Sequence, residues 1–257
     1  MIEIDTIYNE DCLEGMKRID DGAVDCIISD LPYGTTACSW DAVIPFEPLW
    51  EQFKRVIKPN AAIVLFGSEP FSSALRMSNI GMYRYDWVWV KEKAANFQIA
   101  NVQPLKVTEN ICVFGKAKAV NGAKPILRFY PQLEQRDIPL KYGGGKHIGG
   151  ALLHKHSMRE LNKVYDTRHP SNILYFPKEY GTDNLHPTQK PVDLLRYLIL
   201  TYTNEGDTVL DATIGSGTTA VAALMEHRHF IGFETDKGYY DKAVERIADL
   251  RRNPTLF

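Results

Sequence analysis

Residues 206–219 read GDTVLDATIGSGTT: a short apolar strand ends at Asp211 and runs directly into a glycine-rich turn. Gly215 and Gly217 allow the backbone to approach a ligand closely, and the N–H groups that begin the following helix face the same space. The next strand, FIGFE, ends at Glu234. Ligands of open α/β sheets bind beyond the carboxyl ends of the strands, where an acid can hold ribose hydroxyls. These features predict a nucleoside-cofactor site, and a tight strand–helix turn without a ligand is the alternative.

A second apolar strand also ends on an acid, in the stretch IISDLPYGTT at residues 27–36. Asp30 closes the strand, Pro32 stiffens the backbone, Tyr33 offers a flat aromatic face and Gly34 permits a turn. A planar ligand could stack on the tyrosine while its exocyclic amine donates hydrogen bonds to the carboxylate and to a backbone carbonyl, as a flipped-out base would. The alternative is a plain turn in which the acid caps a helix and the tyrosine packs.

Strands alternate with helices along most of the chain, which predicts an α/β domain with a mostly parallel sheet. The length of 257 residues fits one large domain, or a core domain with an insert. Besides the segments above, strands are expected at 24–30, 61–67, 85–91 and 109–116, and helices at 46–57, 70–79, 192–203, 218–228 and 236–252.

The stretch from about residue 117 to 180 lacks this periodicity and carries a different charge. Between residues 116 and 180 there are 12 Lys and Arg against 5 Asp and Glu, a net charge of +7, whereas the rest of the chain carries −9 of the total of −2. Five glycines among residues 142–150 indicate a loop or linker. A basic insert in an acidic protein suggests contact with a polyanion, although a solvated lysine-rich insert would look the same.

Composition excludes several classes of protein. Hydrophobic residues make up 44% of the chain, enough for a sizeable core, so disorder is not expected. No signal-peptide pattern and no apolar run long enough to cross a membrane is present, so we expect a soluble, cytoplasmic protein. The four cysteines, Cys12, Cys26, Cys38 and Cys112, form no CxxC pair and are expected to be reduced. No metal is expected, because the pair His154 and His156 has no second pair.

Three motifs, in their order along the chain, resemble those of the β class of amino-group (N6-adenine and N4-cytosine) DNA methyltransferases. SDLPYG (29–34) resembles the catalytic motif [DNS]PP[YF], and DATIGSGTT (211–219) resembles the S-adenosylmethionine motif DxFxGSGTT. HPTQKP (186–191) resembles the motif that precedes the latter. Leu31 replaces the usual first proline, but the role carried over for that position belongs to its backbone carbonyl, which leucine also has.

The resemblance implies a Rossmann-like S-adenosylmethionine-dependent methyltransferase fold with a mostly parallel sheet, a circularly permuted motif order and a basic target-recognition insert. Residues 1–116 would form the catalytic half of the methyltransferase domain, 117–180 the target-recognition insert, and 181–257 the cofactor-binding half. The implied reaction is methyl transfer from S-adenosylmethionine to adenine N6 in double-stranded DNA by base flipping. An Asp at the first motif position favours adenine in the family, and cytosine N4 is the nearest alternative.

The resemblance and the residue patterns together give three sets of candidate residues. The catalytic candidates are Asp30, Leu31, Pro32 and Tyr33. The cofactor-binding candidates are Asp11, Cys12, Asp30, Thr188, Lys190, Asp211, Gly215, Ser216, Gly217, Thr218, Thr219 and Glu234, with Lys190 expected to pair with the cofactor carboxylate and Asp11 to hold its adenine. The DNA-binding candidates are Lys91, Lys93, Asn96, Lys141, Lys146, His147, Lys155, His156 and Arg159.

Alternatives from other classes are a non-catalytic DNA-binding or cofactor-sensing protein on the same scaffold, and an RNA or protein methyltransferase. The first would be expected to lose the acid or the aromatic of the catalytic motif, and both are present. The second usually has the cofactor motif before the catalytic one. Family resemblance also suggests a homodimer, and the sequence does not indicate whether a restriction endonuclease partner exists.

Overall fold

The computed structural model describes residues 2–34, 41–94, 96–141, 164–177 and 189–253. The chain divides into two compact units. The larger comprises residues Met1–Tyr130 and Asn172–Phe257, and the smaller comprises Pro131–Ser171. The two units are described separately below.

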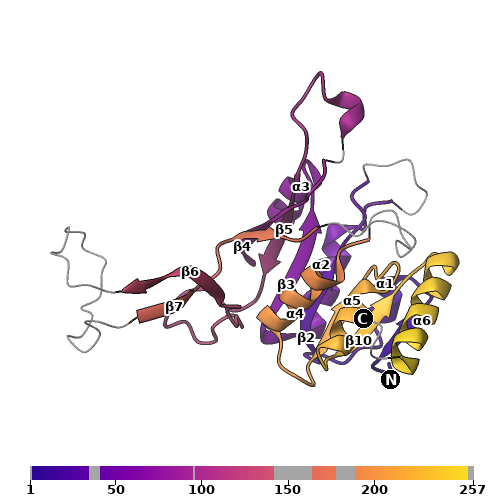
Figure 1. Ribbon diagram of the computed structural model, residues 1–257. Coiled ribbons are helices and arrows are strands. Elements are labelled where there is room, and N and C mark those ends of the chain that lie inside the picture. The colour runs from indigo at the N-terminus through magenta and orange to yellow at the C-terminus, as the bar shows by residue number, and fades with distance from the viewer. Residues whose placement is uncertain (1, 35–40, 95, 142–163, 178–188, 254–257) are drawn as a thin grey trace. The chain divides into compact units, whose positions relative to one another are not determined.

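The larger unit is built on an eight-stranded sheet, with the strands in the order β1-β10-β9-β2-β3-β5-β4-β8. Figure 1 shows β3, β5 and β4 of this sheet beside one another. All neighbouring strands are parallel except β5, which runs antiparallel to β3 and β4. The predicted α/β class with a mostly parallel sheet is therefore confirmed. The strands are β1 (Thr6–Tyr8), β2 (Val24–Ser29), β3 (Ile57–Gly67), β4 (Tyr83–Val90), β5 (Thr108–Phe114), β8 (Ile173–Tyr175), β9 (Thr208–Asp211) and β10 (His229–Phe233).

Helices cover both faces of this sheet, because the central strands bury side chains on each side. On β2, Ile27 belongs to one core cluster, together with residues of α1, α2 and α3. Its neighbours Cys26 and Ile28 belong to the other cluster, with residues of α4, α5 and α6. Strands buried on both faces read as continuous apolar runs rather than alternating ones, as β2 does. The helices are α1 (Cys12–Met16), α2 (Phe46–Val56), α3 (Phe71–Ser78), α4 (Val192–Tyr202), α5 (Thr218–Met225) and α6 (Lys237–Arg252), with a short 3₁₀ helix, η1 (Phe97–Ile99).

The centre of the sheet brings together segments that are far apart in the sequence. β2 pairs with β9 in parallel, with Cys26 opposite Val209 and Ile27 opposite Leu210. From β2 the chain continues through α2 to β3 on one side, and from β9 it continues through α5 to β10 on the other. The strand order therefore reverses between β2 and β9, which is where open α/β sheets bind their ligands.

The smaller unit contains an antiparallel pair, β6 (Glu134–Lys141) and β7 (Val164–Arg168). It is narrower than the predicted insert of residues 117–180. Leu127 is buried in the core of the larger unit, and Arg128 pairs with Asp25 and Asp207 there. β8 pairs with β4. These contacts place residues 117–130 and 172–177 in the larger unit, and the recognition insert of residues 117–180 stays a prediction.

Among the residues that the structure describes, no helix has the length and apolar composition that a membrane crossing requires. Cys12, Cys26 and Cys112 are buried and free, and burial raises the pKa of the Cys12 and Cys112 thiols to about 12. Cys38 lies outside the described residues. Within the described ranges, no cluster of His, Cys, Asp or Glu is arranged to hold a metal ion.

Candidate active site

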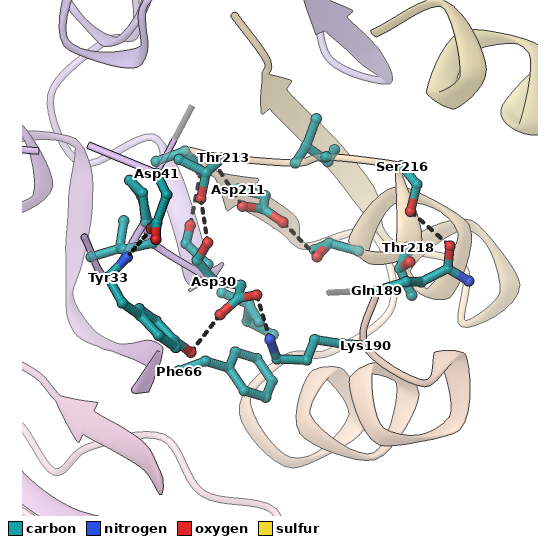
Figure 2. A pocket seen from close by; sticks show the side chains of 18 of the residues that line it. Asp30, Tyr33, Asp41, Phe66, Gln189, Lys190, Asp211, Thr213, Ser216 and Thr218 are labelled. Carbon is teal, nitrogen blue, oxygen red and sulfur yellow. Dashed lines mark hydrogen bonds and ion pairs between the residues drawn. The ribbon is translucent and has the colours of Figure 1, made fainter. Parts of the chain in front are cut away.

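A cavity of about 930 Å³ lies in the larger unit, at the carboxyl ends of β2 and β9. Residues 28–33 at and after the end of β2 form one part of its wall, and residues 211–216 with Thr218 and Thr219 form another. The cavity is also lined by Glu234, which follows β10. Gln189 and Lys190, which precede α4, form a further part of the wall (Figure 2). The two motifs that the sequence placed at separate strand ends thus share one cavity.

Hydrogen bonds between the two strand ends fix the catalytic motif against the glycine turn. The Thr213 hydroxyl donates to the backbone carbonyl of Asp30 at 3.0 Å, and the Ala212 N–H donates to the Ser29 hydroxyl at 2.8 Å. On the other side of the motif, the backbone N–H groups of Tyr33 and Gly34 both donate to one carboxylate oxygen of Asp41, at 2.7 and 2.9 Å. The Tyr33 ring also stacks on Phe71, with centroids 4.9 Å apart. The backbone and the ring of the motif are therefore held in place.

The carboxylate of Asp30 belongs to a buried cluster of charges. The Tyr33 hydroxyl lies 2.7 Å from Asp30 Oδ1 and also 2.7 Å from Glu109 Oε1. Lys190 Nζ donates to Asp30 Oδ2 and lies 3.3 Å from Glu109 Oε1, and Lys91 Nζ lies 2.5 Å from Glu109 Oε2. Figure 2 shows Tyr33 and Lys190 approaching Asp30 from two sides. Two carboxylates and two ammonium groups balance one another's charge within this cluster.

Burial and neighbouring charges perturb this cluster in opposite ways. Burial raises the pKa of Asp30, the Glu109 charge adds to the rise, and Lys190 counteracts it. Burial also opposes ionisation of Glu109, but Lys190 and Lys91 together outweigh it and lower its pKa to about 2. The pKa of Lys190 is raised, because Asp30 and Glu109 outweigh the effect of its burial. Strongly perturbed carboxylates in a cleft are typical of catalytic sites.

The glycine turn connects to the other predicted cofactor residues. Gly215 and Gly217 have φ of 56° and 81°, in the left-handed region that glycine tolerates best. The Gly215 N–H donates to Glu234 Oε2 at 2.9 Å, so the acid of β10 is held against the turn. Ser216 donates to Gln189 Oε1 at 2.9 Å. Thr218 begins α5 and lines the cavity with Thr219.

Asp11 and Cys12 line the same cavity. Asp11 is also the N-cap of α1, where its Oδ1 accepts the Leu13 N–H at 2.7 Å. Asp11 thus caps α1 and also forms part of the cavity wall.

Asp211 is buried, and its charge is only partly compensated. Thr219 Oγ1 donates to Oδ2 at 2.6 Å and the Thr213 N–H to Oδ1 at 3.1 Å, but burial still raises the pKa of Asp211 to about 6. The unfolded chain would release this proton near the ordinary value of about 3.9. The folded state therefore binds this proton more tightly than the unfolded chain does. The free energy of unfolding falls progressively as the pH rises from about 4 toward about 6, because the buried side chain becomes charged.

We expect Asp211→Asn to stabilise the protein more at neutral pH than at acidic pH, because asparagine does not ionise. Between about pH 5 and about pH 7.5 the free energy of unfolding of the variant, relative to the wild type, should rise by about 1–2 kcal/mol. Urea denaturation at the two pH values measures this difference. A difference that does not change with pH, or that falls as pH rises, would contradict the raised pKa.

The DNA-binding candidates fall into two groups. Lys91 is paired with Glu109, and its side chain is only 18% exposed, so it lies against the catalytic cluster; its contact with DNA stays a prediction. The Asn96 side chain makes two hydrogen bonds within its own loop: it donates to the Pro104 carbonyl at 3.1 Å and accepts from the Lys106 N–H at 2.6 Å. Asn96 also lines the cavity. Lys93 is exposed in this loop. Lys141 ends β6. The other candidates, Lys146, His147, Lys155, His156 and Arg159, lie outside the described residues, as does the cofactor candidate Thr188.

Several residues of the site were missed by sequence reasoning. Glu109 lies near the start of β5, ahead of the apolar run 111–114, and is only 6% exposed. An acid at the start of such a strand was the available signal. Asp41 and Gln189 were also missed, and each orients a residue of a recognised motif. Lys190 was expected to pair with a cofactor carboxylate, but in the structure it pairs with Asp30 and Glu109.

The cavity at this switch point joins an acid–aromatic corner to a glycine turn, as expected of an α/β protein that binds a ligand at the carboxyl ends of its strands. The family model described as DNA methylase, N6/N4 type, matches residues 24–245, and the chain belongs to this family. The resemblance seen in the motifs is thereby confirmed.

Curated relatives match along nearly the whole chain. The chain is 26% identical to the Type II methyltransferase M.HindIII of Haemophilus influenzae, covering 97% of each chain. It is 29% identical to the Type II methyltransferase M.BglII of Bacillus subtilis, covering 95% of this chain and 69% of the relative.

Solved structures show the same fold at lower identity. The M1.HpyAVI–SAM complex has a TM-score of 0.61 and 23% identity, with 94% of this chain and 98% of the other covered. The PvuII DNA methyltransferase, described as cytosine-N4-specific, has a TM-score of 0.65 and 14% identity, with 96% and 91% covered. Both structures share the Rossmann-like methyltransferase fold of this chain.

Proposed function

We propose that this chain is a site-specific DNA methyltransferase that transfers a methyl group from S-adenosylmethionine to adenine N6 in duplex DNA, with the target base turned out of the helix. The observation that carries the proposal is the shared cavity in which Asp30 and the 211–219 turn meet at neighbouring strand ends. The family is one of DNA methylases, and two of its relatives are described as Type II methyltransferases. We therefore infer a role as the modification enzyme of a restriction–modification system.

The residues present fit S-adenosylmethionine. A Cβ placed on Gly215 would have no atom within 4 Å, so the turn presents bare backbone to the cavity. Next to it, Glu234 can accept hydrogen bonds from ribose hydroxyls, and Asp11, on the same wall, can accept one from an adenine amine. Ser216, held by Gln189, supplies a further polar group. When bound, S-adenosylmethionine supplies a methyl group activated by a positively charged sulfur.

The catalytic motif can prepare an exocyclic amine for attack. The lone pair of such a nitrogen is delocalised into the base, so it is a weak nucleophile. Hydrogen bonds to the Asp30 carboxylate and to the Leu31 carbonyl would localise the lone pair and turn the nitrogen toward tetrahedral geometry. Asp30 would also stabilise the positive charge that develops on the amine. Tyr33, fixed by Phe71, would offer its ring for stacking of the base.

The choice of adenine rests on the acid at the first position of the catalytic motif. Cytosine N4 presents a similar amine, and the same hydrogen bonds would serve it. Incubating the protein with methyl-labelled S-adenosylmethionine and duplex DNA, followed by digestion and mass spectrometry, distinguishes the two bases. We expect N6-methyladenine. N4-methylcytosine alone would overturn the choice of base, and no methylated nucleoside in any duplex DNA tested would overturn the proposed function.

A further inference from the structure

Both oxygens of the Asp30 carboxylate are already engaged by the protein. Oδ1 accepts from the Tyr33 hydroxyl at 2.7 Å, and Oδ2 accepts from Lys190 Nζ. The proposed reaction requires at least one of these oxygens for the amine of the base. Each carboxylate oxygen can accept more than one hydrogen bond, but an Asp30 released from Lys190 would stabilise the positive charge that develops on the amine more strongly than one that stays paired.

Glu109 is within reach of both donors. Its Oε1 lies 2.7 Å from the Tyr33 hydroxyl and 3.3 Å from Lys190 Nζ. A hydroxyl has a single hydrogen, so Tyr33 can donate to only one of the two carboxylates at a time. Lys190 likewise lies between the two acids. Each donor thus needs only a small local rearrangement to exchange Asp30 for Glu109.

Charge balance favours this exchange over release of Lys190 to water. The side chains of Glu109 and Lys190 are only 5% and 9% exposed. Separating a buried pair leaves an uncompensated charge, which is strongly destabilising. The amine of a base is neutral. If Lys190 moves to Glu109 while the base occupies Asp30, the cluster that includes Lys91 keeps its balance of two negative and two positive charges.

We propose that Glu109 is a positioning residue that takes over the Tyr33 and Lys190 hydrogen bonds from Asp30, so that the Asp30 carboxylate becomes available to the target amine. This proposal rests on the proposed methyltransferase function. Lys190 is then an exchangeable counter-ion of the catalytic acid. Lys91 holds Glu109 in position from the opposite side, through Oε2.

Glu109→Gln tests the proposal, because glutamine keeps the size of the side chain and loses its charge. Lys190 should then remain on Asp30. We expect kcat, measured at saturating cofactor and DNA, to fall about tenfold, the difference between a charge-assisted and a neutral hydrogen bond. The affinity for S-adenosylmethionine, measured by calorimetry, should stay within about twofold.

The pH profile provides a readout that a purely structural role would not move. The groups that face Asp30 are Tyr33, Lys190, Glu109 and, from β9, Asp211. The Glu109 charge raises the pKa of Asp30, whereas Lys190 lowers it. Without the Glu109 charge the pKa of Asp30 should fall, so the acid limb of the rate profile should move to lower pH. Glu226→Gln is the matched control: Glu226 pairs with Arg196 at 2.6 Å and does not line the cavity. Its profile should remain that of the wild type.

A second substitution separates trapping by Lys190 from general damage. In the double variant Glu109→Gln/Lys190→Gln, Asp30 no longer has a cation that competes with the amine. Its kcat should therefore lie between those of Glu109→Gln and the wild type. The acid limb should lie at higher pH than in the wild type, because Lys190 no longer lowers the pKa of Asp30. If Glu109→Gln does not fold, Lys190→Gln alone should show the same upward shift of the acid limb.

Wild-type kcat in Glu109→Gln, or a double variant slower than Glu109→Gln, would overturn the role of Glu109. For Lys190→Gln alone, an unshifted acid limb would do the same. An inactive wild type would instead contradict the proposed function, so the two failures are distinguishable. In duplexes with 2-aminopurine at the target position, Glu109→Gln should also show less fluorescence from the flipped base than the wild type or Glu226→Gln.

Discussion

Replacing Asp30 with asparagine should lower the rate of methyl transfer about a hundredfold to a thousandfold, the range found when one preorganised electrostatic contact is removed from a transition state. Asparagine retains the shape of the side chain and one carbonyl acceptor, but it has no negative charge to stabilise the developing positive charge on the amine. Binding of S-adenosylmethionine should be nearly unchanged, because we place the cofactor at the glycine turn. Single-turnover kinetics with labelled cofactor, together with calorimetry, measure the two effects.

Asp25→Asn is the matched control for this experiment. Asp25 lies on β2, the strand that Asp30 directly follows; it is buried and paired with Lys58 and Arg128, but it does not line the cavity. The control should lose stability while its folded fraction transfers methyl groups at the wild-type rate. A near-normal rate in Asp30→Asn would contradict the assignment of Asp30 as the catalytic acid.

Gly215→Val should weaken the binding of S-adenosylmethionine about a hundredfold, which corresponds to about 2.7 kcal/mol. A Cβ added at Gly215 would have no atom within 4 Å, so the valine side chain would extend into the space at the cavity wall where we place the cofactor. The left-handed backbone adds a separate loss of stability of about 1–2 kcal/mol. Calorimetry of cofactor binding and urea denaturation measure the two effects.

Gly206→Val separates these effects. Gly206 also has a positive φ, of 77°, and open space around its Cβ, but it lies in the turn before β9 and does not line the cavity. This control should show a similar loss of stability with normal cofactor affinity. Equal losses of affinity in both variants would mean that backbone strain, and not the filled cavity, weakens binding.

The sequence allowed the two halves of the site to be predicted because each half is local. An apolar strand that ends in an acid, followed by a turn residue, can be read from a few neighbouring positions, and parallel strands bring such ends to one edge. Asp30 and Asp211 lie close together because β2 pairs with β9 in parallel. The α/β pattern and the resemblance to a permuted family both predicted that these two strand ends would be neighbours.

The rest of the site depends on contacts that leave no local signal. Glu109 reaches Tyr33 only because β5 runs antiparallel between β3 and β4, and the sequence pattern does not fix that order. Lys190 stands in a recognised motif, yet its partners come from β5 and from the end of β2. The limits of the smaller unit likewise depend on pairings distant in sequence, since Arg128 and β8 bind within the larger unit.

The pairing of β2 with β9 joins the two motif-bearing halves of the larger unit through hydrogen bonds, and the polypeptide connection between these strands runs elsewhere. The reaction at the ends of β2 and β9 depends on these two strands being neighbours in the sheet. It does not depend on which of the two comes first in the sequence. A gene could therefore carry the two halves in either order and still encode the same reaction centre, provided that each half keeps its own strand–turn–helix intact.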